Sequence, residues 1–247
     1  MSDLFSLKGR TALVTGANAG IGQAIAVTLA GQGAHVLCAG RRASDDTLAA
    51  IDAAGGTGET VLVDFADPMA GRDLFAGRDV SLLVNNAGII RRADSVDYGE
   101  DDWDAVMDVN LKALFFTTQA FGRALIAREE PGAVVNIASL LSFQGGIRVP
   151  AYTASKHGVA GLTKILANEW APHRITVNAI APGYIATSNT QALQDDPARS
   201  TAILDRIPAG RWGDPGDIAG TAAFLCSGAA SYVTGTVINV DGGWLAR

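Results

Sequence analysis

A tyrosine and a lysine four positions apart are the side chains best suited to acid–base chemistry in this sequence. Tyr152 and Lys156 would lie on one face of a helix, because residues i and i+4 are neighbours on a helix surface. A free phenol has a pKa of about 10, and a nearby ammonium lowers it by favouring the phenolate. Ser139 follows an apolar run upstream, within reach of a carbonyl or hydroxyl bound in the same cleft. The set predicts proton transfer, although the Tyr–Lys pair alone would also suit an exposed helix surface.

Glycines between an apolar run and a helical pattern predict a phosphate-binding turn. The segment Thr15–Gly22 reads TGANAGIG and ends the apolar run 11–15. Glycines allow a tight turn and close approach of the backbone to a pyrophosphate, and the next helix offers N–H donors at its N-terminus. The spacing G-x-x-x-G-x-G differs from G-x-G-x-x-G, so the loop alone could also be a plain turn. Residues 85–88, with the sequence NNAG, follow a later apolar run and would line the same cleft.

Short apolar runs alternate with helical patterns along the chain, and this alternation predicts how these motifs are positioned. The expected strands lie at 11–15, 35–39, 61–63, 82–84, 133–137, 175–180 and 237–240, and the expected helices at 20–31, 48–54, 101–128 and 154–170. Alternating strands and helices predict an α/β fold, with a seven-stranded parallel sheet covered by helices on both faces. We expect one domain over 1–247, in which the irregular region at about 186–216, rich in proline, forms a lid.

Composition excludes several classes of protein. The 19 Lys and Arg against 25 Asp and Glu give a formal charge of −6, and no basic run offers a nucleic-acid surface. No long apolar stretch predicts a membrane span, and the first residues lack the features of a signal peptide, so we expect a cytoplasmic protein with no membrane partner. The two cysteines and three histidines have no metal-ligand spacing, so no metal site is expected.

Together the motifs resemble the short-chain dehydrogenase/reductase family over essentially the whole chain. The resemblance is carried by TGxxxGIG from Thr15, NNAG from Asn85, Asn110, Ser139, Tyr152-x-x-x-Lys156 and Pro182-Gly183, all in order. It implies a three-layer Rossmann-like fold, a nicotinamide cofactor and a homotetramer. It also implies that Tyr152 exchanges the proton, that Lys156 lowers the pKa of Tyr152 and binds the ribose, that Ser139 polarises the carbonyl and that Asn110 holds a water of the proton relay.

The same resemblance implies a set of residues that contact the cofactor. Asp64 would lie beside the adenine, and Ile185 and Thr187 would contact the carboxamide end. The full set is Gly16, Asn18, Gly20, Ile21, Gly22, Arg41, Arg42, Asp64, Phe65, Asn86, Ala87, Gly88, Tyr152, Lys156, Pro182, Gly183, Ile185 and Thr187.

Two features depart from the family pattern. The interval from Asp64 to Asn85 is short, so we expect the helix between those strands to be shortened or replaced by a loop. The second strand runs into Arg41 and Arg42 without an acidic residue for the ribose 2′-hydroxyl of NAD, and an arginine suits the 2′-phosphate of NADP. Ala19 argues against NADP, because many NADP-preferring members have a basic residue at this position. We therefore expect NADP or NAD, with NADP favoured.

Four segments narrow the resemblance to enzymes that act on 2-dehydro-3-deoxy-D-gluconate and related keto-deoxy sugar acids in pectin and alginate breakdown. These segments are 88–92, 139–152, 207–213 and 241–247. A sugar-acid carboxylate favours a bidentate arginine, for which Arg148, Arg91 and the adjacent Arg92 are candidates, although each would also suit a solvated surface. Ser139 and Gln144 would complete the substrate site. A 3-oxoacyl thioester or another small ketone is the alternative substrate, and a non-enzymatic dinucleotide-binding protein is disfavoured because every expected catalytic side chain is present.

Overall fold

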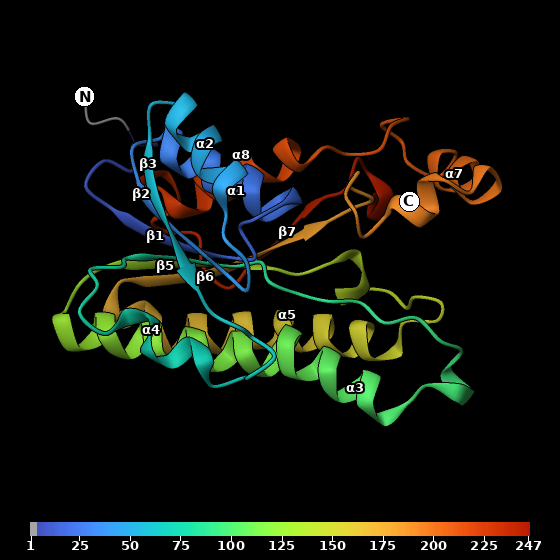
Figure 1. Ribbon diagram of the computed structural model, residues 1–247, viewed down its shortest axis with the longest axis horizontal. Coiled ribbons are helices and arrows are strands. Elements are labelled where there is room, and N and C mark those ends of the chain that lie inside the picture. The colour runs from blue at the N-terminus through green and yellow to red at the C-terminus, as the bar shows by residue number, and fades with distance from the viewer. Residues whose placement is uncertain (1–3) are drawn as a thin grey trace.

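Seven parallel strands form one sheet in the order β3-β2-β1-β4-β5-β6-β7 in the computed structural model, which describes residues 4–247 (Figure 1). The strands are β1 Thr11–Thr15, β2 His35–Gly40, β3 Thr57–Leu62, β4 Leu82–Asn85, β5 Gly132–Ile137, β6 Ile175–Pro182 and β7 Val237–Val240. Strand order reverses between β1 and β4, and ligands of such sheets bind beyond the carboxyl ends of the strands at this point. The predicted seven-stranded parallel sheet is confirmed.

Helices cover both faces of the sheet (Figure 1). The helices α1 Gly20–Gly31, α2 Asp45–Ala53 and α8 Pro215–Cys226 cover one face, and α3 Glu100–Met107, α4 Leu114–Arg128 and α5 Pro150–Trp170 cover the other. Successive strand residues point to opposite faces, so Val14 packs in the core beneath α1 and α8, whereas Leu13 packs beneath α4 and α5. This double burial explains why the central strands are almost continuously apolar.

Three connections differ in detail from a plain alternation. A 3₁₀ turn, Ala70–Phe75, replaces the helix between β3 and β4, as the short interval predicts. The predicted helix 101–128 is divided into α3 and α4 by a π-helical turn, Asp108–Ala113. The remaining 3₁₀ turns are Ser95–Asp97, Leu140–Ser142, Ala171–His173, Gly228–Ala230 and Trp244–Ala246.

The region 186–216 is more regular than its proline content suggests. It contains α6 Gln191–Gln194 and α7 Pro197–Leu204, which Figure 1 shows at one end of the molecule beside the carboxyl terminus. Asp196 caps α7 by accepting hydrogen bonds from the backbone N–H groups of Ala198 and Arg199 (both 3.1 Å), and Pro197 occupies the first helical position. The expectation of a long irregular segment is therefore corrected to two short helices.

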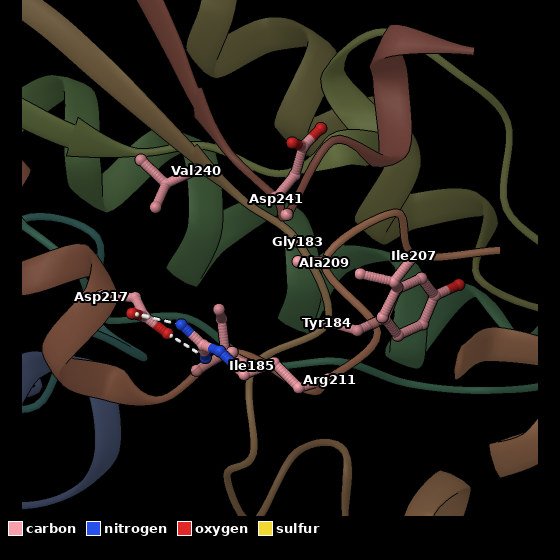
Figure 2. Close-up of a pocket in the computed structure, with 11 residues that line it drawn as sticks. Gly183, Tyr184, Ile185, Ile207, Ala209, Arg211, Asp217, Val240 and Asp241 are labelled. Atoms are coloured by element: carbon pink, nitrogen blue, oxygen red, sulfur yellow. Dashed lines mark hydrogen bonds and ion pairs between the residues drawn. The ribbon is translucent and has the colours of Figure 1, made fainter. Parts of the chain in front are cut away.

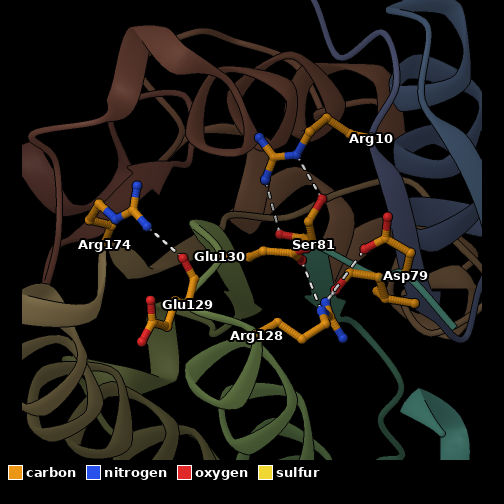
Figure 3. Close-up of polar contacts among 8 residues, drawn as sticks. Arg10, Asp79, Ser81, Arg128, Glu129, Glu130 and Arg174 are labelled. Atoms are coloured by element: carbon orange, nitrogen blue, oxygen red, sulfur yellow. Dashed lines mark hydrogen bonds and ion pairs between the residues drawn. The ribbon is translucent and has the colours of Figure 1, made fainter. Parts of the chain in front are cut away.

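Charged side chains tie the strands together at their amino ends, the edge opposite the site described below (Figure 3). Arg10, next to β1, donates to the Ser81 hydroxyl (2.7 Å) and carbonyl (3.1 Å) just before β4. Arg128, at the end of α4, pairs with Glu130 (2.8 Å) and Asp79 (3.6 Å). These contacts fix the ends of the central strands.

Across residues 4–247, no helix is long and apolar enough to cross a membrane, and no group of metal-ligating side chains gathers. Residues 1–3, part of the segment considered for a signal peptide, lie outside the described residues.

Candidate active site

The turn between β1 and α1 has the shape that a phosphate group requires. Gly16 and Gly20 adopt left-handed φ values of 66° and 57°, which favour glycine. A Cβ on Gly22 would lie 2.2 Å from the Gly16 carbonyl oxygen and 2.4 Å from Nδ2 of Asn86, so no larger residue fits there without movement. Ala19 precedes α1 without a side-chain cap, which leaves the first N–H groups of α1, beginning at Gly20 and Ile21, to bind a ligand. The predicted glycines thus form a cradle that fits a pyrophosphate.

The turn after β4 is hydrogen-bonded to this cradle. The backbone N–H groups of Asn86 and Ala87 both donate to Oγ1 of Thr15 (2.9 Å each). The Asn86 side-chain amide donates to the carbonyl oxygens of Thr15 (2.9 Å) and Gly16 (3.1 Å). The NNAG motif therefore joins the ends of β1 and β4 and, with Gly88 exposed beside it, forms one wall of the cleft.

The residues predicted at the adenosine end lie together beyond β2 and β3. Nε of Arg41 is 3.9 Å from Oδ1 of Asp64, and both side chains are more than half exposed, so this ion pair is weak. Arg42 is exposed beside them, and Phe65 is buried. Oδ1 of Asn18 lies 4.0 Å from the position of a Cβ on Gly40, at the end of β2. Two exposed guanidinium groups thus lie where a ribose phosphate would be bound.

Ser139 and Tyr152 come together from two different elements. Ser139 follows β5 and caps the Leu140–Ser142 turn, where its Oγ accepts a hydrogen bond from the Leu141 N–H (3.2 Å). Tyr152 lies in the first turn of α5, which Pro150 begins, and the Ser139 hydroxyl lies close enough to lower the pKa of the Tyr152 phenol. The two predicted side chains therefore place their hydroxyls in the same pocket.

Lys156 lies one helical turn after Tyr152 and is buried. Its Nζ donates a 2.6 Å hydrogen bond to the Ile137 carbonyl oxygen, at the end of β5, and lies 5.5 Å from the centre of the Tyr152 ring. Burial lowers the pKa of Lys156 from 10.5 to about 8. The lysine is therefore fixed between the end of β5 and the Tyr152 ring.

The protonation of Tyr152 differs from the sequence-based expectation. Burial raises the pKa of Tyr152 above 10, and the opposing effects come from the Ser139 hydrogen bond and the positive charge of Arg92. The expected lowering of this pKa by Lys156 is therefore not the main electrostatic effect, because burial of the phenol outweighs the charges near it.

Asn110 connects the π-helical turn to the loop after β4. Its Oδ1 accepts from the Ile89 N–H (2.8 Å), and its Nδ2 donates to the Ile89 carbonyl (2.9 Å) and to Oγ of Ser155 (3.3 Å). π-Helical turns inside α-helices are rare and frequent at functional sites. In this structure the turn places Asn110 to hold the loop that follows Gly88.

A buried ladder of amides and hydroxyls supports the carboxyl ends of β4 and β5. Nδ2 of Asn85 donates to Oδ1 of Asn136 and to Oγ1 of Thr118 (2.8 Å each), and Nδ2 of Asn136 donates to Oγ1 of Thr163 (3.0 Å). The sequence analysis missed Asn136, Thr118 and Thr163. Polar residues inside an apolar strand and on the buried faces of helices were the available signal.

The loop after β6 closes the remaining side of the cleft. A Cβ on Gly183 would lie 2.6 Å from Cα of Asp241, so Pro182-Gly183 passes directly against the chain after β7. The Thr187 methyl lies 3.5 Å from the position of a Cβ on Gly20, which brings the two predicted ends of the cofactor site into contact, and Ile185 is buried at the base of this loop.

Beside this loop lies a small cavity that sequence reasoning missed (Figure 2). Its volume is about 180 Å³, and Gly183, Ile185 and Arg211 are among the residues that line it. Arg211 forms a bidentate ion pair with Asp217 at the start of α8, with N–O distances of 2.7 and 2.9 Å (Figure 2). The hydrogen bond from Arg211 lowers the pKa of Asp217 to about 2. The pair anchors the far end of the 186–216 segment.

A larger pocket of about 350 Å³ opens over the two hydroxyls. Ser139, Tyr152 and the predicted Gln144 line it, and Oε1 of Gln144 accepts from the Trp244 indole N–H (3.4 Å). Two aromatic rings form one wall, where the Tyr184 ring lies 4.7 Å from the Trp244 ring. The Trp212 ring packs 5.6 Å from the Tyr184 ring without lining the pocket.

Of the three arginines that the sequence analysis named as candidates for the substrate carboxylate, only Arg92 lines this pocket. Arg91 pairs with Asp102 (3.2 Å) and Arg148 with Asp94 (3.1 Å), and neither lines the pocket. The lining arginines are instead Arg92, Arg199 and Arg206. The sequence analysis missed Arg199 and Arg206, which lie in the predicted lid, where a search for cations would have found them.

Comparison with known proteins finds similar oxidoreductases along almost the whole chain. The family model described as Enoyl-(Acyl carrier protein) reductase matches residues 16–245. The 2-dehydro-3-deoxy-D-gluconate 5-dehydrogenase of Bacillus subtilis is 53% identical, and the match covers 100% of this chain and 99% of that protein. Its Escherichia coli counterpart is 50% identical over 98% of each chain.

Solved structures are similar along the whole chain. A crystal structure of a candidate 2-deoxy-D-gluconate 3-dehydrogenase from Agrobacterium tumefaciens with bound NADP is 68% identical, with a TM-score of 0.98 over 99% of this chain and 100% of that one. A gluconate 5-dehydrogenase from Burkholderia cenocepacia in complex with NADP and tartrate is 38% identical, with a TM-score of 0.92 over 99% of this chain and 98% of that one.

Proposed function

Because this chain belongs to the short-chain dehydrogenase/reductase family, we propose that it transfers a hydride between a nicotinamide cofactor and a keto-deoxy sugar acid of the 2-dehydro-3-deoxy-D-gluconate type. The observation that carries the proposal is the meeting of the Ser139 and Tyr152 hydroxyls at the floor of a pocket whose walls hold three arginines. A cleft for an acidic ketone or alcohol requires both features.

The chain's own residues supply the proton and hold the reacting oxygen. In the direction of reduction, the substrate carbonyl oxygen accepts hydrogen bonds from Ser139 and Tyr152, which polarise the carbonyl. The bound dihydronicotinamide supplies the hydride to the carbonyl carbon. Tyr152 then gives its hydroxyl proton to the oxygen, which leaves a phenolate and an alcohol, and oxidation reverses these transfers.

Lys156 and Asn110 complete the proposed arrangement. The Lys156 ammonium, held against the Ile137 carbonyl, stabilises the Tyr152 phenolate that the proton transfer creates. Asn110 fixes the loop after β4 through both of its hydrogen bonds to Ile89 and holds a water of the relay that returns a proton to the tyrosine.

We propose that the glycine cradle between β1 and α1 holds the pyrophosphate, with NADP favoured over NAD. The support is the space that a Cβ on Gly22 would fill, together with Arg41 and Arg42 beyond β2 and the NADP bound in the two similar structures. In this arrangement the arginines contact the 2′-phosphate, and Thr187 and Ile185 contact the carboxamide end. The region 186–216 acts as a lid over the substrate.

The test mixes the purified protein with 2,5-diketo-3-deoxygluconate and either NADPH or NADH, and measures oxidation of the cofactor from its absorbance. We expect oxidation of NADPH, and we expect Tyr152→Phe to abolish turnover while leaving NADPH binding, followed by fluorescence, nearly intact. A Tyr152→Phe protein that retains turnover would remove Tyr152 from the mechanism. A wild type that binds NADPH but reduces only a 3-oxoacyl thioester would replace the substrate with the alternative; a Vibrio cholerae relative that is 40% identical has that activity in its name.

We also propose a homotetramer. The support is an open apolar groove between α5 and the π-helical turn that leads into α4, lined by Leu111, Phe115 and Leu162, which a second copy would cover. Light scattering after size exclusion would refute assembly if the mass were that of one chain, 25.4 kDa. A cytoplasmic location stays a prediction from the first residues and the lack of long apolar stretches, and a role in pectin and alginate breakdown stays a prediction from the resemblance.

A further inference from the structure

The pocket above Tyr152 contains an unusual concentration of positive charge. Arg92, Arg199 and Arg206 all line it, and none of its described lining residues is acidic. Arg92 lies in the loop after β4, whereas Arg199 lies in α7 and Arg206 just after it. Three separate positions in the sequence thus contribute cations to one cavity of about 350 Å³.

Two of these guanidinium groups lack the partners that other arginines have. Elsewhere in the chain, Arg91, Arg148 and Arg211 each pair with a carboxylate at 2.7–3.2 Å. Within residues 4–247, the side chains of Arg199 and Arg206 donate no hydrogen bond and form no ion pair. Arg92 donates only to the Asn189 carbonyl (3.1 Å), which leaves its charge without a counter-ion. The pocket therefore attracts an anion.

Arg206 is also held in position. Its guanidinium carbon lies 4.0 Å from the centre of the Trp244 ring, a stacking distance, and Trp244 is only 4% exposed. Stacking of this kind holds the plane of the group while leaving its N–H edge free for a carboxylate. A guanidinium that is oriented in this way loses less freedom when it binds an anion.

The three cations lie near different tyrosines of the pocket. The charge of Arg92 acts on Tyr152, whereas the charges of Arg199 and Arg206 act on Tyr184. Tyr184 packs on Trp244, so Arg206 belongs to the aromatic wall. In a keto-deoxy hexonate the carboxylate lies several carbon atoms from the reacting C5, so the side chains that bind the carboxylate need not be those that contact the reacting oxygen.

We propose that Arg206 and Arg199 bind the substrate carboxylate, with Arg206 stacked on Trp244 as the principal contact. This inference rests on the proposed function for the identity of the acid, but not for the existence of an anion site. It makes the segment around α7 the part of the enzyme that distinguishes a sugar acid from a neutral ketose. Because both arginines belong to the 186–216 segment, the carboxylate also holds that segment over the reacting carbon.

The test measures binding of tartrate, a hydroxylated dicarboxylate, by calorimetry to the NADPH-saturated protein. Threitol, the neutral polyol with the same carbon skeleton, is the uncharged comparison. We expect Arg206→Gln and Arg199→Gln to weaken tartrate binding about 10- to 150-fold, the factor for one hydrogen bond to a charged group, without changing the response to threitol. Arg206→Lys should retain part of the affinity, because it keeps the charge and loses the bidentate fork.

Arg148→Gln is the matched control, because Arg148 is exposed near the pocket but pairs with Asp94 outside it. It should bind tartrate as the wild type does, and unchanged NADPH affinity in all variants would show that the fold is intact. The proposal is overturned if the wild type does not bind tartrate, or if Arg206→Gln and Arg199→Gln bind it as tightly as the Arg148→Gln control.

Turnover separates this proposal from the proposed function. If the wild type reduces 2,5-diketo-3-deoxygluconate, both glutamine variants should raise its KM by a similar factor with kcat changed little. Normal KM values would refute the carboxylate site and leave the reaction in place. If the wild type shows no turnover but its tartrate binding depends on Arg206 and Arg199, the substrate is wrong and the anion site stands.

Discussion

Replacing Lys156 by methionine should make the protein more stable at neutral pH while removing its activity. The ammonium is buried, and its pKa falls from 10.5 to about 8 because burial disfavours the charged form. At about 1.4 kcal/mol for each pH unit, this difference means that keeping Lys156 charged in the fold costs about 3 kcal/mol. Methionine has a similar length and fills the same space without a charge.

Loss of the hydrogen bond to the Ile137 carbonyl reduces this gain. Its 2.6 Å contact with Nζ disappears in Lys156→Met, and an intramolecular hydrogen bond contributes about 1 kcal/mol. We therefore expect a net stabilisation of about 2 kcal/mol near neutral pH. For a chain of this length, that corresponds to a rise in Tm of about 4–8 °C.

The pH dependence of the stability difference between Lys156→Met and the wild type tests whether the buried charge causes that difference. The folded pKa of Lys156 lies below the unfolded value, so the unfolded chain binds the proton more tightly, and wild-type stability rises with pH between about 8 and 10.5. The advantage of Lys156→Met is complete below pH 8 and shrinks above it. Urea unfolding across this range, with the exposed Lys164→Met on the same helix as control, measures the effect. A variant less stable than wild type at neutral pH, or a gain that does not change with pH, would refute the reasoning.

Two further outcomes test the electrostatics and the cofactor cradle. Arg92→Gln should move the pH dependence of kcat/KM for oxidation to higher pH, because the Arg92 charge lowers the pKa of Tyr152. The neighbouring Arg91→Gln is the control and should leave the profile unchanged. Identical pH profiles for the two variants would contradict the effect of Arg92 on Tyr152. Gly22→Ala should weaken NADPH binding at least about 10-fold, because its Cβ would lie 2.2 Å from the Gly16 oxygen and displace the cradle. Gly31→Ala in the same helix, with open space around it, is the control, and equal fluorescence titrations would argue against the cradle.

The central strands could be predicted from sequence because helices bury them on both sides. The predicted strands 11–15 and 82–84 match β1 and β4 within one residue, since burial on both faces leaves a continuous apolar run. β3 was predicted only at 61–63, although it begins at Thr57, because an edge strand keeps polar residues such as Glu59 on its partly solvated faces. Apolar patterning identifies buried backbone and misses exposed backbone.

Features that depend on local backbone geometry were harder to predict. The π-helical turn leaves the apolar pattern of 101–128 uninterrupted, so one helix was expected where α3 and α4 lie on either side of Asn110. The start of α7 did have a signal, since Asp196 before Pro197 is a favourable pair for a helix N-terminus. Short helices with few apolar residues are easily mistaken for loops.

The proposed catalytic residues and the arginines proposed to bind the substrate differ in how well the sequence predicts them. Tyr152 and Lys156 share one helix, so their spacing alone fixes their relation. The choice between Arg91 and Arg92 depends on which way each side chain turns out of an irregular loop, and spacing does not determine that. Arg206 joins the pocket only because the 186–216 segment folds back against Trp244.

The aromatic wall of the substrate pocket gives the protein an optical reporter of its own. Of the four tryptophans, Trp244 lines the pocket and Trp212 packs on Tyr184 beside it, whereas Trp170 lies in the core beneath α4 and α5 and Trp103 lies on α3. Indole emission responds to nearby charge. An anion that pairs with the guanidinium of Arg206, which is stacked on Trp244, would therefore change the wavelength and intensity of the Trp244 emission. Binding of a carboxylate at Arg206 and Arg199 could then be followed in real time without a label, separately from the nicotinamide fluorescence.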